Sequence, residues 1–146
     1  RIIVTGRIKH FISAFGEHVI GKEVEHAMQE ATKSFNLNMT EFTVAPKLNP
    51  IKGLPYHEWF IEFGHTPNNI HEIEAFIDQS MQKQNSYYFD LIKGKVLQPL
   101  KIHVVNKGGF NDYMSTIGKL GGQNKIPRLS NDRKIADVLS NLVNVN

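Results

Sequence analysis

The chain contains no cysteine among its 146 residues. This absence excludes disulfide bonds, thiolate metal ligands and cysteine nucleophiles, and it fits a reducing, cytoplasmic compartment. No apolar run approaches the roughly 20 residues that a membrane-spanning helix needs. The chain also lacks clusters of like charge, because its 17 Lys and Arg residues are scattered along the sequence. Together with 14 Asp and Glu residues they give a formal net charge of +3. Nucleic-acid-binding domains usually gather their basic residues on one face, so we expect neither a nucleic-acid nor a membrane partner.

The chain begins with residues typical of a strand, Arg1 to Gly6, without an initiator Met or a signal peptide. We therefore expect a fragment of a larger polypeptide. No repeat, low-complexity tract or long linker divides residues 1–146, so we expect the fragment to be a single domain.

Hydrophobic spacing predicts an alternation of strands and helices. Helical spacing begins at Gly21, where Val24, Met28 and Ala31 recur on one face. The alternation of Trp59, Ile61 and Phe63 with Glu58, Phe60 and Glu62 predicts a half-buried strand over 57–64. The complete prediction is a β-hairpin in 1–20, a polar connector in 36–40, strands at 42–45, 57–64 and 100–105, helices starting at Thr66, Asn85, Phe110 and Ser130 or Asn131, and an exposed loop over 118–128. This order predicts an α+β domain with a small mixed or antiparallel sheet covered by helices.

The seven histidines have no spacing that suits a metal site, so we expect no bound metal. Two glycine-containing loops, 6–20 and 121–129, each place a cation in or beside flexible backbone. A lysine on such a loop can be delivered to a phosphate when the loop or its domain closes. On spacing alone, a solvated surface lysine is the simpler explanation.

Ordered motifs in both halves of the chain favour delivery of a loop lysine to a phosphate over a solvated surface lysine. Gly6, Arg7, Lys9, Gly16, Glu23 and Glu25 match in register the hinge-and-hairpin motif of the ANL adenylate-forming superfamily. The later motifs are a Pro-Leu-x-Ile-x-Val-Val strand at 99–105, Gly109-Phe110 with Met114, and Lys-x-Pro-Arg at 125–128. This set resembles the C-terminal domain of the auxin-responsive acyl-acid-amido synthetase family, across nearly the whole chain.

The resemblance implies a mobile lid that rides on a large N-terminal domain, which is absent from this chain. The full enzyme would use ATP with Mg²⁺, bound mainly by that N-terminal domain. A carboxylic acid would first form an acyl-adenylate with release of pyrophosphate, and an amino acid would then displace AMP to form an amide. The partners implied are the N-terminal domain and these two small substrates, and the isolated fragment should be inactive.

The resemblance also assigns roles to individual residues. Lys125 is the expected catalytic ammonium, because it can neutralise the negative charge that grows on the phosphate during adenylation. Arg7 and Arg128 are expected nucleotide or phosphate contacts, although Arg128 could instead hold its loop. Lys9 is the expected hinge. The remaining residues, Gly16, Glu17 and His18, lie on the loop expected to enter the site for the second step, where Glu17 or His18 could accept a proton from the amine.

Two alternatives remain open from the sequence. One is an acyl-CoA ligase or another adenylate-forming enzyme. Ser13 argues weakly against the ligase, because some members that form thioesters carry a lysine there. The other alternative is a non-catalytic module that binds a partner through its basic loops.

Overall fold

The computed structural model describes residues 11–12, 14–116 and 126–143. Its centre is a three-stranded sheet in the order β3-β4-β5. Strand β3 (Asn38–Lys47) is antiparallel to β4 (Tyr56–His65), and β5 (Lys101–Val104) is parallel to β4. The sheet is therefore mixed, and the predicted α+β class is confirmed.

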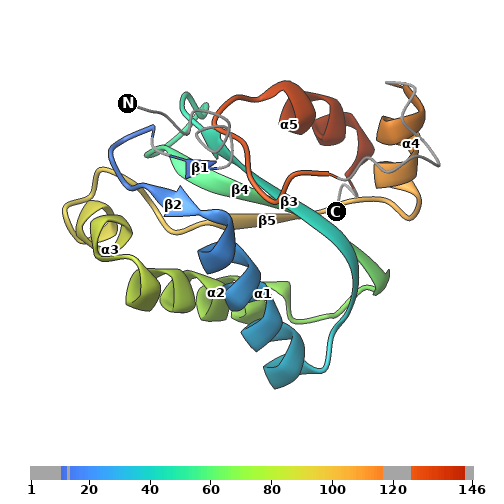
Figure 1. Ribbon diagram of the computed structural model, residues 1–146, viewed down its shortest axis with the longest axis horizontal. Helices are drawn as coiled ribbons and strands as arrows, with labels where there is room; N and C mark the ends of the chain where they lie inside the picture. The colour runs from blue at the N-terminus through green and yellow to red at the C-terminus, as the bar shows by residue number, and fades with distance from the viewer. Residues whose placement is uncertain (1–10, 13, 117–125, 144–146) are drawn as a thin grey trace, which may run out of the picture.

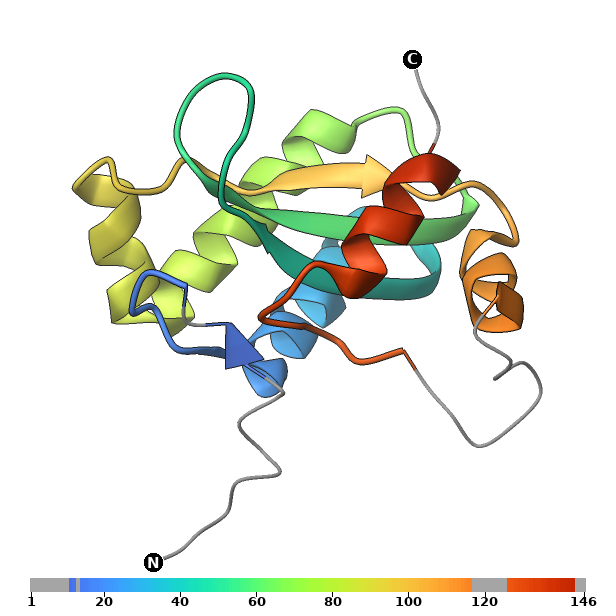
Figure 2. The ribbon, with the colours of Figure 1, turned by 90° about the horizontal axis from the view of Figure 1, so that it is seen from above.

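Helices cover both faces of this sheet (Figure 1). The helices α1 (Gly21–Phe35) and α2 (Ile70–Gln84) lie on one face. The helices α4 (Gly109–Thr116) and α5 (Lys134–Leu139), with the 3₁₀ helix η2 (Ser140–Leu142), lie on the other. Helix α3 (Ser86–Lys93) lies at one end. Seen from above, α5 crosses the strands on the side opposite α1 and α2 (Figure 2). None of the described helices combines the length and apolarity needed to cross a bilayer.

The larger hydrophobic cluster fills the space between the sheet and α1 with α2. Strand β4 contributes Trp59, Ile61 and Phe63, each at most 2% exposed. The Trp59 ring stacks on Phe42 of β3 at an interplanar angle of 6°. Burial of this alternating face follows the sequence pattern and supplies much of the hydrophobic stabilisation of the domain.

The opposite face of β4 is buried as well, so the prediction of a half-buried strand was wrong. Phe60 is 1% exposed and belongs to a second cluster with residues of α4 and α5. Glu58 and Glu62, on the same face, are 5% and 8% exposed. Their charges had indicated exposure to solvent, but each carboxylate has hydrogen-bond or ion-pair partners that compensate for its burial. The central strand of a sheet with helices on both faces has no solvent-facing side.

Three element boundaries also differ from the prediction. Strand β3 begins at Asn38, within the expected polar connector, and continues through Pro46. Proline is tolerated there because β3 is an outer strand of the sheet. Helix α2 begins at Ile70 rather than Thr66, and α5 begins at Lys134. The carboxylate of Asp132 accepts the Lys134 N–H at 3.0 Å, which satisfies one amide at that helix start.

Part of the predicted N-terminal hairpin is confirmed. Strand β1 (Phe11–Ile12) pairs antiparallel with β2 (Val19–Ile20). The sequence had indicated a different pairing, of residues 2–4 with 10–15: residues 1–10 lie outside the described residues, and residues 14–15 form a turn instead of continuing the strand. The described hairpin leads directly into α1.

Candidate functional site

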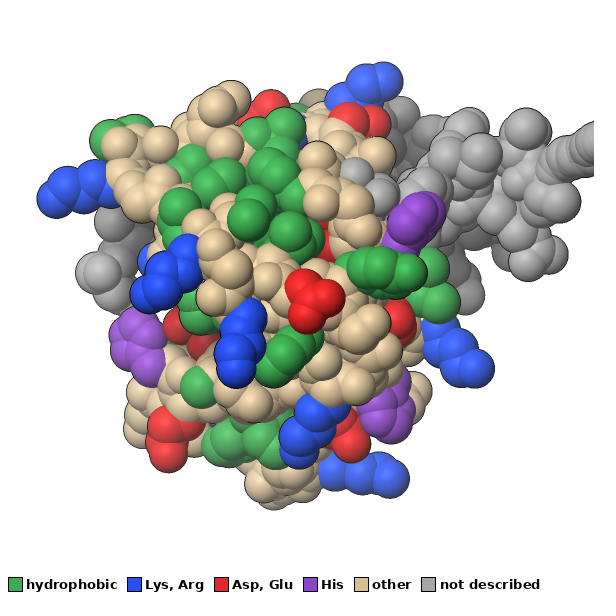
Figure 3. All heavy atoms as spheres, turned by 90° about the vertical axis from the view of Figure 1, so that its left-hand side faces the viewer, with side chains coloured by type: hydrophobic (Ala, Val, Ile, Leu, Met, Phe, Trp, Pro, Cys, Tyr) green, Lys and Arg blue, Asp and Glu red, His purple; other side chains and the backbone are tan. Residues whose placement is uncertain are grey.

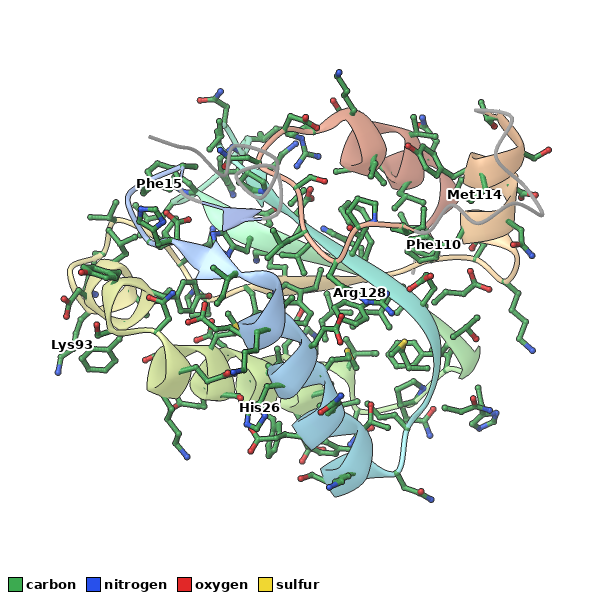
Figure 4. The ribbon with its side chains drawn as sticks, viewed as in Figure 1. Phe15, His26, Lys93, Phe110, Met114 and Arg128 are labelled. Atoms are coloured by element: carbon green, nitrogen blue, oxygen red, sulfur yellow. The ribbon has the colours of Figure 1, made fainter. Side chains whose placement is uncertain are left out.

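The structure describes four of the seven residues expected to act. Lys125, Arg7 and Lys9 lie outside the described residues. Gly16, Glu17 and His18 lie together on the connection between β1 and β2, and Arg128 lies between α1 and β3 (Figure 4, where Phe15 marks the first region).

The connection 14–18 is a tight turn with one buried side chain. Gly16 has φ +89° and His18 has φ +48°, so both residues adopt the left-handed conformation. Glycine adopts this conformation freely, whereas histidine does so only where its surroundings hold it. Gly16 and His18 are exposed, and Glu17 between them is fully buried. The turn therefore presents two residues outward and uses the third as an anchor.

The anchor is a hydrogen bond between Glu17 and His57 of β4. Glu17 Oε2 lies 2.7 Å from His57 Nε2, and Glu17 Oε1 accepts the Phe15 N–H at 2.8 Å. Burial raises the pKa of the Glu17 carboxyl, but the hydrogen bond and the charge of His57 outweigh burial, so the pKa lies below its ordinary value. The carboxylate faces the protein interior. The expected proton-accepting role of Glu17 or His18 stays a prediction.

A second anchor is Asn85, the N-cap of α3. Its Nδ2 lies 2.9 Å from the Glu17 carbonyl oxygen, 3.3 Å from that of His18 and 3.1 Å from Glu23 Oε1. Its Oδ1 accepts the Tyr88 N–H at 2.9 Å. One side chain thus caps a helix and binds the backbone of the 14–18 turn.

Arg128 is bound by two glutamates and an aromatic ring. Its Nη1 forms an ion pair with Glu41 and donates to the Phe42 carbonyl at 3.2 Å, and its Nε lies 3.4 Å from Glu25. The guanidinium carbon lies 4.6 Å from the centre of the Phe42 ring. A cation over an aromatic face is attracted by the ring quadrupole. Arg128 therefore holds its own segment against β3 and α1, and its expected nucleotide contact stays a prediction.

The backbone around Arg128 extends the edge of the sheet. The Val44 N–H donates to the Arg128 carbonyl, and the Ser130 N–H donates to the Val44 carbonyl, both at 2.9 Å. Ile126 and Leu129 are 6% and 1% exposed. Residues 126–128, expected to belong to an exposed loop over 118–128, are instead fixed to β3 by hydrogen bonds and burial, and residues 118–125 lie outside the described residues.

A cleft of about 370 Å³ lies beside Arg128, between α1 and β3. Met28, Met39 and Phe42 supply apolar surface, and Glu25, Gln29, Thr32, Lys33 and Arg128 supply polar groups. Figure 4 shows Arg128 among the side chains between α1 and the strands. The volume of this cleft lies within the range typical of small-molecule sites.

On the other face of the sheet, Glu58 fastens α5. Its Oε2 lies 2.9 Å from His103 Nε2, and its Oε1 lies 2.7 Å from Arg133 Nη1. The second contact is an ion pair by distance, although its angle lies outside hydrogen-bond geometry. Burial raises the pKa of Glu58, but the hydrogen bond of His103 and the charge of Arg133 hold it below its ordinary value. Glu62 accepts the N–H groups of Gly108 (3.0 Å) and Phe110 (3.3 Å), which fixes the start of α4.

No group of three or more His, Asp or Glu side chains within the described ranges could hold a metal ion. We therefore assign no metal ligand in this part of the chain.

The comparison with protein families decides the family. The model of the GH3 family C-terminal domain matches residues 22–134, which include the described cleft and both faces of the sheet. The chain belongs to the GH3 family. No curated protein sequence matches this GH3 domain.

Solved structures support the same fold. The GH3 domain superposes on a GH3.15 acyl acid amido synthetase with a TM-score of 0.77 at 21% identity, covering 94% of this chain and 27% of that one. A second structure, an AtGH3.15 acyl acid amido synthetase in complex with 2,4-DB, gives a TM-score of 0.73 at 18% identity, with 94% and 26% coverage. The GH3 domain thus spans about a quarter of the length of these chains.

Sequence reasoning missed the anchoring role of His57 and Asn85. His57 was set aside with the other histidines because no metal spacing included it. The order Asn85-Ser86 before an apolar helical pattern does indicate an N-cap. Nothing in the sequence showed that the amide of this cap would contact a turn 68 residues earlier.

Proposed function

We propose that this chain is the C-terminal domain of an ATP-dependent acyl acid amido synthetase. The observation that carries the proposal is the match of the GH3 C-terminal domain across residues 22–134. The fold shared with two acyl acid amido synthetases supports it. Because the chain spans about a quarter of those proteins, the ATP and acyl-acid pockets are assigned mainly to an N-terminal domain.

In the proposed first step, a carboxylate oxygen of the acid attacks the α-phosphorus of ATP. The bond from this phosphorus to the bridging oxygen breaks, and pyrophosphate leaves. In the second step, the amine nitrogen of an amino acid attacks the acyl carbon, the bond from that carbon to the AMP oxygen breaks, and the nitrogen loses a proton. Mg²⁺ bound with ATP would neutralise phosphate charge when present.

The first step brings two anions together, so a cation delivered by the lid lowers its barrier. We assign this cation to Lys125. The backbone that follows is anchored, since Ile126 and Leu129 are buried and Arg128 is bound by Glu41. The backbone that directly follows the assigned residue is therefore fixed to β3.

The test is Lys125→Ala in the full-length enzyme. We expect adenylation, measured as pyrophosphate release, to fall by about 100- to 1,000-fold. Amide formation from supplied acyl-adenylate should fall much less, because the displacement of pyrophosphate at the α-phosphorus is already complete. Equal losses in both steps would show that Lys125 does not act specifically in adenylation.

The acceptor is tested separately, with the unmodified enzyme and a preformed acyl-adenylate. Amide products with a pool of amino acids, and no thioester with coenzyme A, are the expected result. Thioester formation would favour an acyl-CoA ligase. The 146-residue chain alone should release no pyrophosphate from ATP with Mg²⁺ and carboxylic acids. Robust release would show a self-contained site and contradict the lid assignment.

A further inference from the structure

The turn 14–18 has little local structure of its own to hold its shape. The strands β1 and β2 that flank it are two residues long each. Gly16 and His18 both have positive φ, and the side chain of His18 is exposed. Short pairing and exposed backbone are features of segments that open easily. Within the turn, the Phe15 N–H donates to Glu17 Oε1, and contacts from outside the turn add to this constraint.

Three elements supply these contacts from the interior. His57 of β4 binds the Glu17 side chain, and Asn85 binds the carbonyls of Glu17 and His18. Glu23, in the first turn of α1, accepts the Ile20 N–H at 3.0 Å through the same oxygen that Asn85 binds. The contacts join the turn to β4, to the start of α3 and to α1.

The orientation of Asn85 is itself determined. A backbone N–H can only donate, so the atom that faces the Tyr88 N–H must be the amide oxygen. The amide nitrogen is then directed at the turn and at Glu23. Tyr88 is fully buried, and its hydroxyl donates to Asp78 Oδ1 at 2.5 Å, which holds the first turn of α3 in place. Asn85 is 5% exposed, so water competes little for these bonds.

We propose that Asn85 is a positioning residue that, with His57, keeps the 14–18 turn preformed for the second half-reaction. This rests on the proposed function, together with the expectation from the sequence that the turn enters the site for the second step. Because the anchors belong to three elements, a rotation of the domain carries the turn without reshaping it. A preformed turn loses less conformational entropy when it meets the amine and the adenylate.

Figures 1 and 2 show the turn and α3 at the same end of the molecule, and Figure 3 looks onto that end, where hydrophobic side chains gather beside basic ones. Helix α3 contributes the exposed rings of Tyr87 (61%) and Phe89 (39%). Asn85 joins this helix to the turn through one amide group.

The distinguishing variant is Asn85→Asp in the full-length enzyme. Aspartate retains an oxygen for the Tyr88 N–H and so keeps the helix cap. It removes the donors to Glu17 and His18 and places a carboxylate beside Glu23. The matched control is Asn69→Asp at the N-cap of α2, where the side chain makes no capping hydrogen bond.

If the repulsion at Glu23 prevents folding, Asn85→Asp combined with Glu23→Gln takes its place. Glutamine at position 23 removes the negative charge that faces the carboxylate introduced at position 85, and it keeps an amide oxygen for the Ile20 N–H. The carbonyls of Glu17 and His18 still lack their donor. This double variant therefore tests, in a folded protein, the hydrogen bonds by which Asn85 holds the 14–18 turn.

Two measurements are made on each variant. Pyrophosphate release should match that of Asn69→Asp, whereas amide formation from supplied acyl-adenylate and a pool of amino acids should fall by about 10- to 100-fold. The acyl group is that of the acid giving most pyrophosphate in a screen of aromatic and aliphatic acids. Hydrogen exchange at the amides of residues 14–20 should quicken, with no change in β4 and α2.

Unchanged amide formation, or equal losses in both half-reactions, would overturn the proposal. Unchanged exchange at residues 14–20 would overturn it as well, whether or not the enzyme forms an amide. If instead the unmodified enzyme makes no acyl-adenylate, the proposed function fails, and the exchange result still decides whether Asn85 holds the turn.

Discussion

The carboxylate of Glu17 lies 2.7 Å from Nε2 of His57, and the two side chains are 0% and 2% exposed. The pair connects the N-terminal turn to the central strand of the sheet, 40 residues later in the chain. A buried charge without a partner is far more unfavourable than a buried pair. The two residues are therefore expected to depend on each other energetically.

His57→Phe should destabilise the protein by about 3–5 kcal/mol, because Glu17 would keep a buried charge without its partner. The double variant Glu17→Leu with His57→Phe should lose much less, since two apolar side chains replace the pair together. Urea denaturation monitored by the fluorescence of Trp59 measures both. A double variant as unstable as the sum of the single variants would show that the two side chains are independent.

The pH dependence of stability should follow Glu17 and Glu58. The pKa of each carboxyl is below its ordinary value of 4.5 in the folded protein. The folded state therefore binds fewer protons than the unfolded state near that pH, and stability falls as pH falls. The contribution is complete above about pH 4.5 and is lost as pH drops through the lowered folded values.

Thermal melting between about pH 6 and pH 3 measures this effect. Glu58→Gln should reduce the fall in melting temperature on acidification, because glutamine has no proton to gain. Glu25→Gln is the control, since Glu25 is half exposed and its contact with Arg128 is long. An equal reduction in both variants would mean that the acid response is a general charge effect.

The sequence predicted the parts of the fold that rest on one local pattern. The spacing of Val24, Met28 and Ala31 defined α1, and the alternation of Trp59, Ile61 and Phe63 defined β4. Asn85 marked the start of α3, where the structure has its N-cap. These signals lie within a few residues of the elements that they specify.

Partners distant in the sequence could not be predicted in this way. Glu58 was assigned to solvent because its ion pair with Arg133 depends on the segment that starts α5, far along the chain. Leu129 pairs with Val44 at the edge of the sheet. The sequence around Leu129 has no hydrophobic periodicity that predicts a strand, and the glycines before it favoured a loop. At the site, family motifs pointed to the 14–18 turn, whereas its anchors, His57 and Asn85, come from elements outside those motifs.

Gly109→Ala should destabilise the protein by about 1–3 kcal/mol. A Cβ at this position would lie 2.4 Å from Cγ1 of Val105, a β-branched side chain that is 2% exposed and has little freedom to move. Gly21→Ala is the matched control, because no atom lies within 4 Å of its Cβ and it also occupies the first residue of a helix. Chemical denaturation should show a neutral or slightly stabilising effect at Gly21.

Substitution of Arg128 can distinguish a structural role of this residue from a nucleotide contact. Its side chain is 34% exposed, so loss of its ion pairs in Arg128→Met should lower stability by only about 1 kcal/mol. If the guanidinium also reaches the nucleotide, pyrophosphate release by the full-length enzyme should fall by about 100-fold. Arg128→Lys should recover only part of that loss, because an ammonium cannot reproduce the planar, forked geometry.

The control for this prediction is Glu41→Gln, which removes the charge of the main partner of Arg128 and leaves the guanidinium in place. We expect it to lower stability by a similar amount and to leave pyrophosphate release nearly unchanged. Comparable losses of pyrophosphate release in Glu41→Gln and Arg128→Met would mean that Arg128 acts by holding the 126–130 segment on β3. The nucleotide contact would then have to come from another residue.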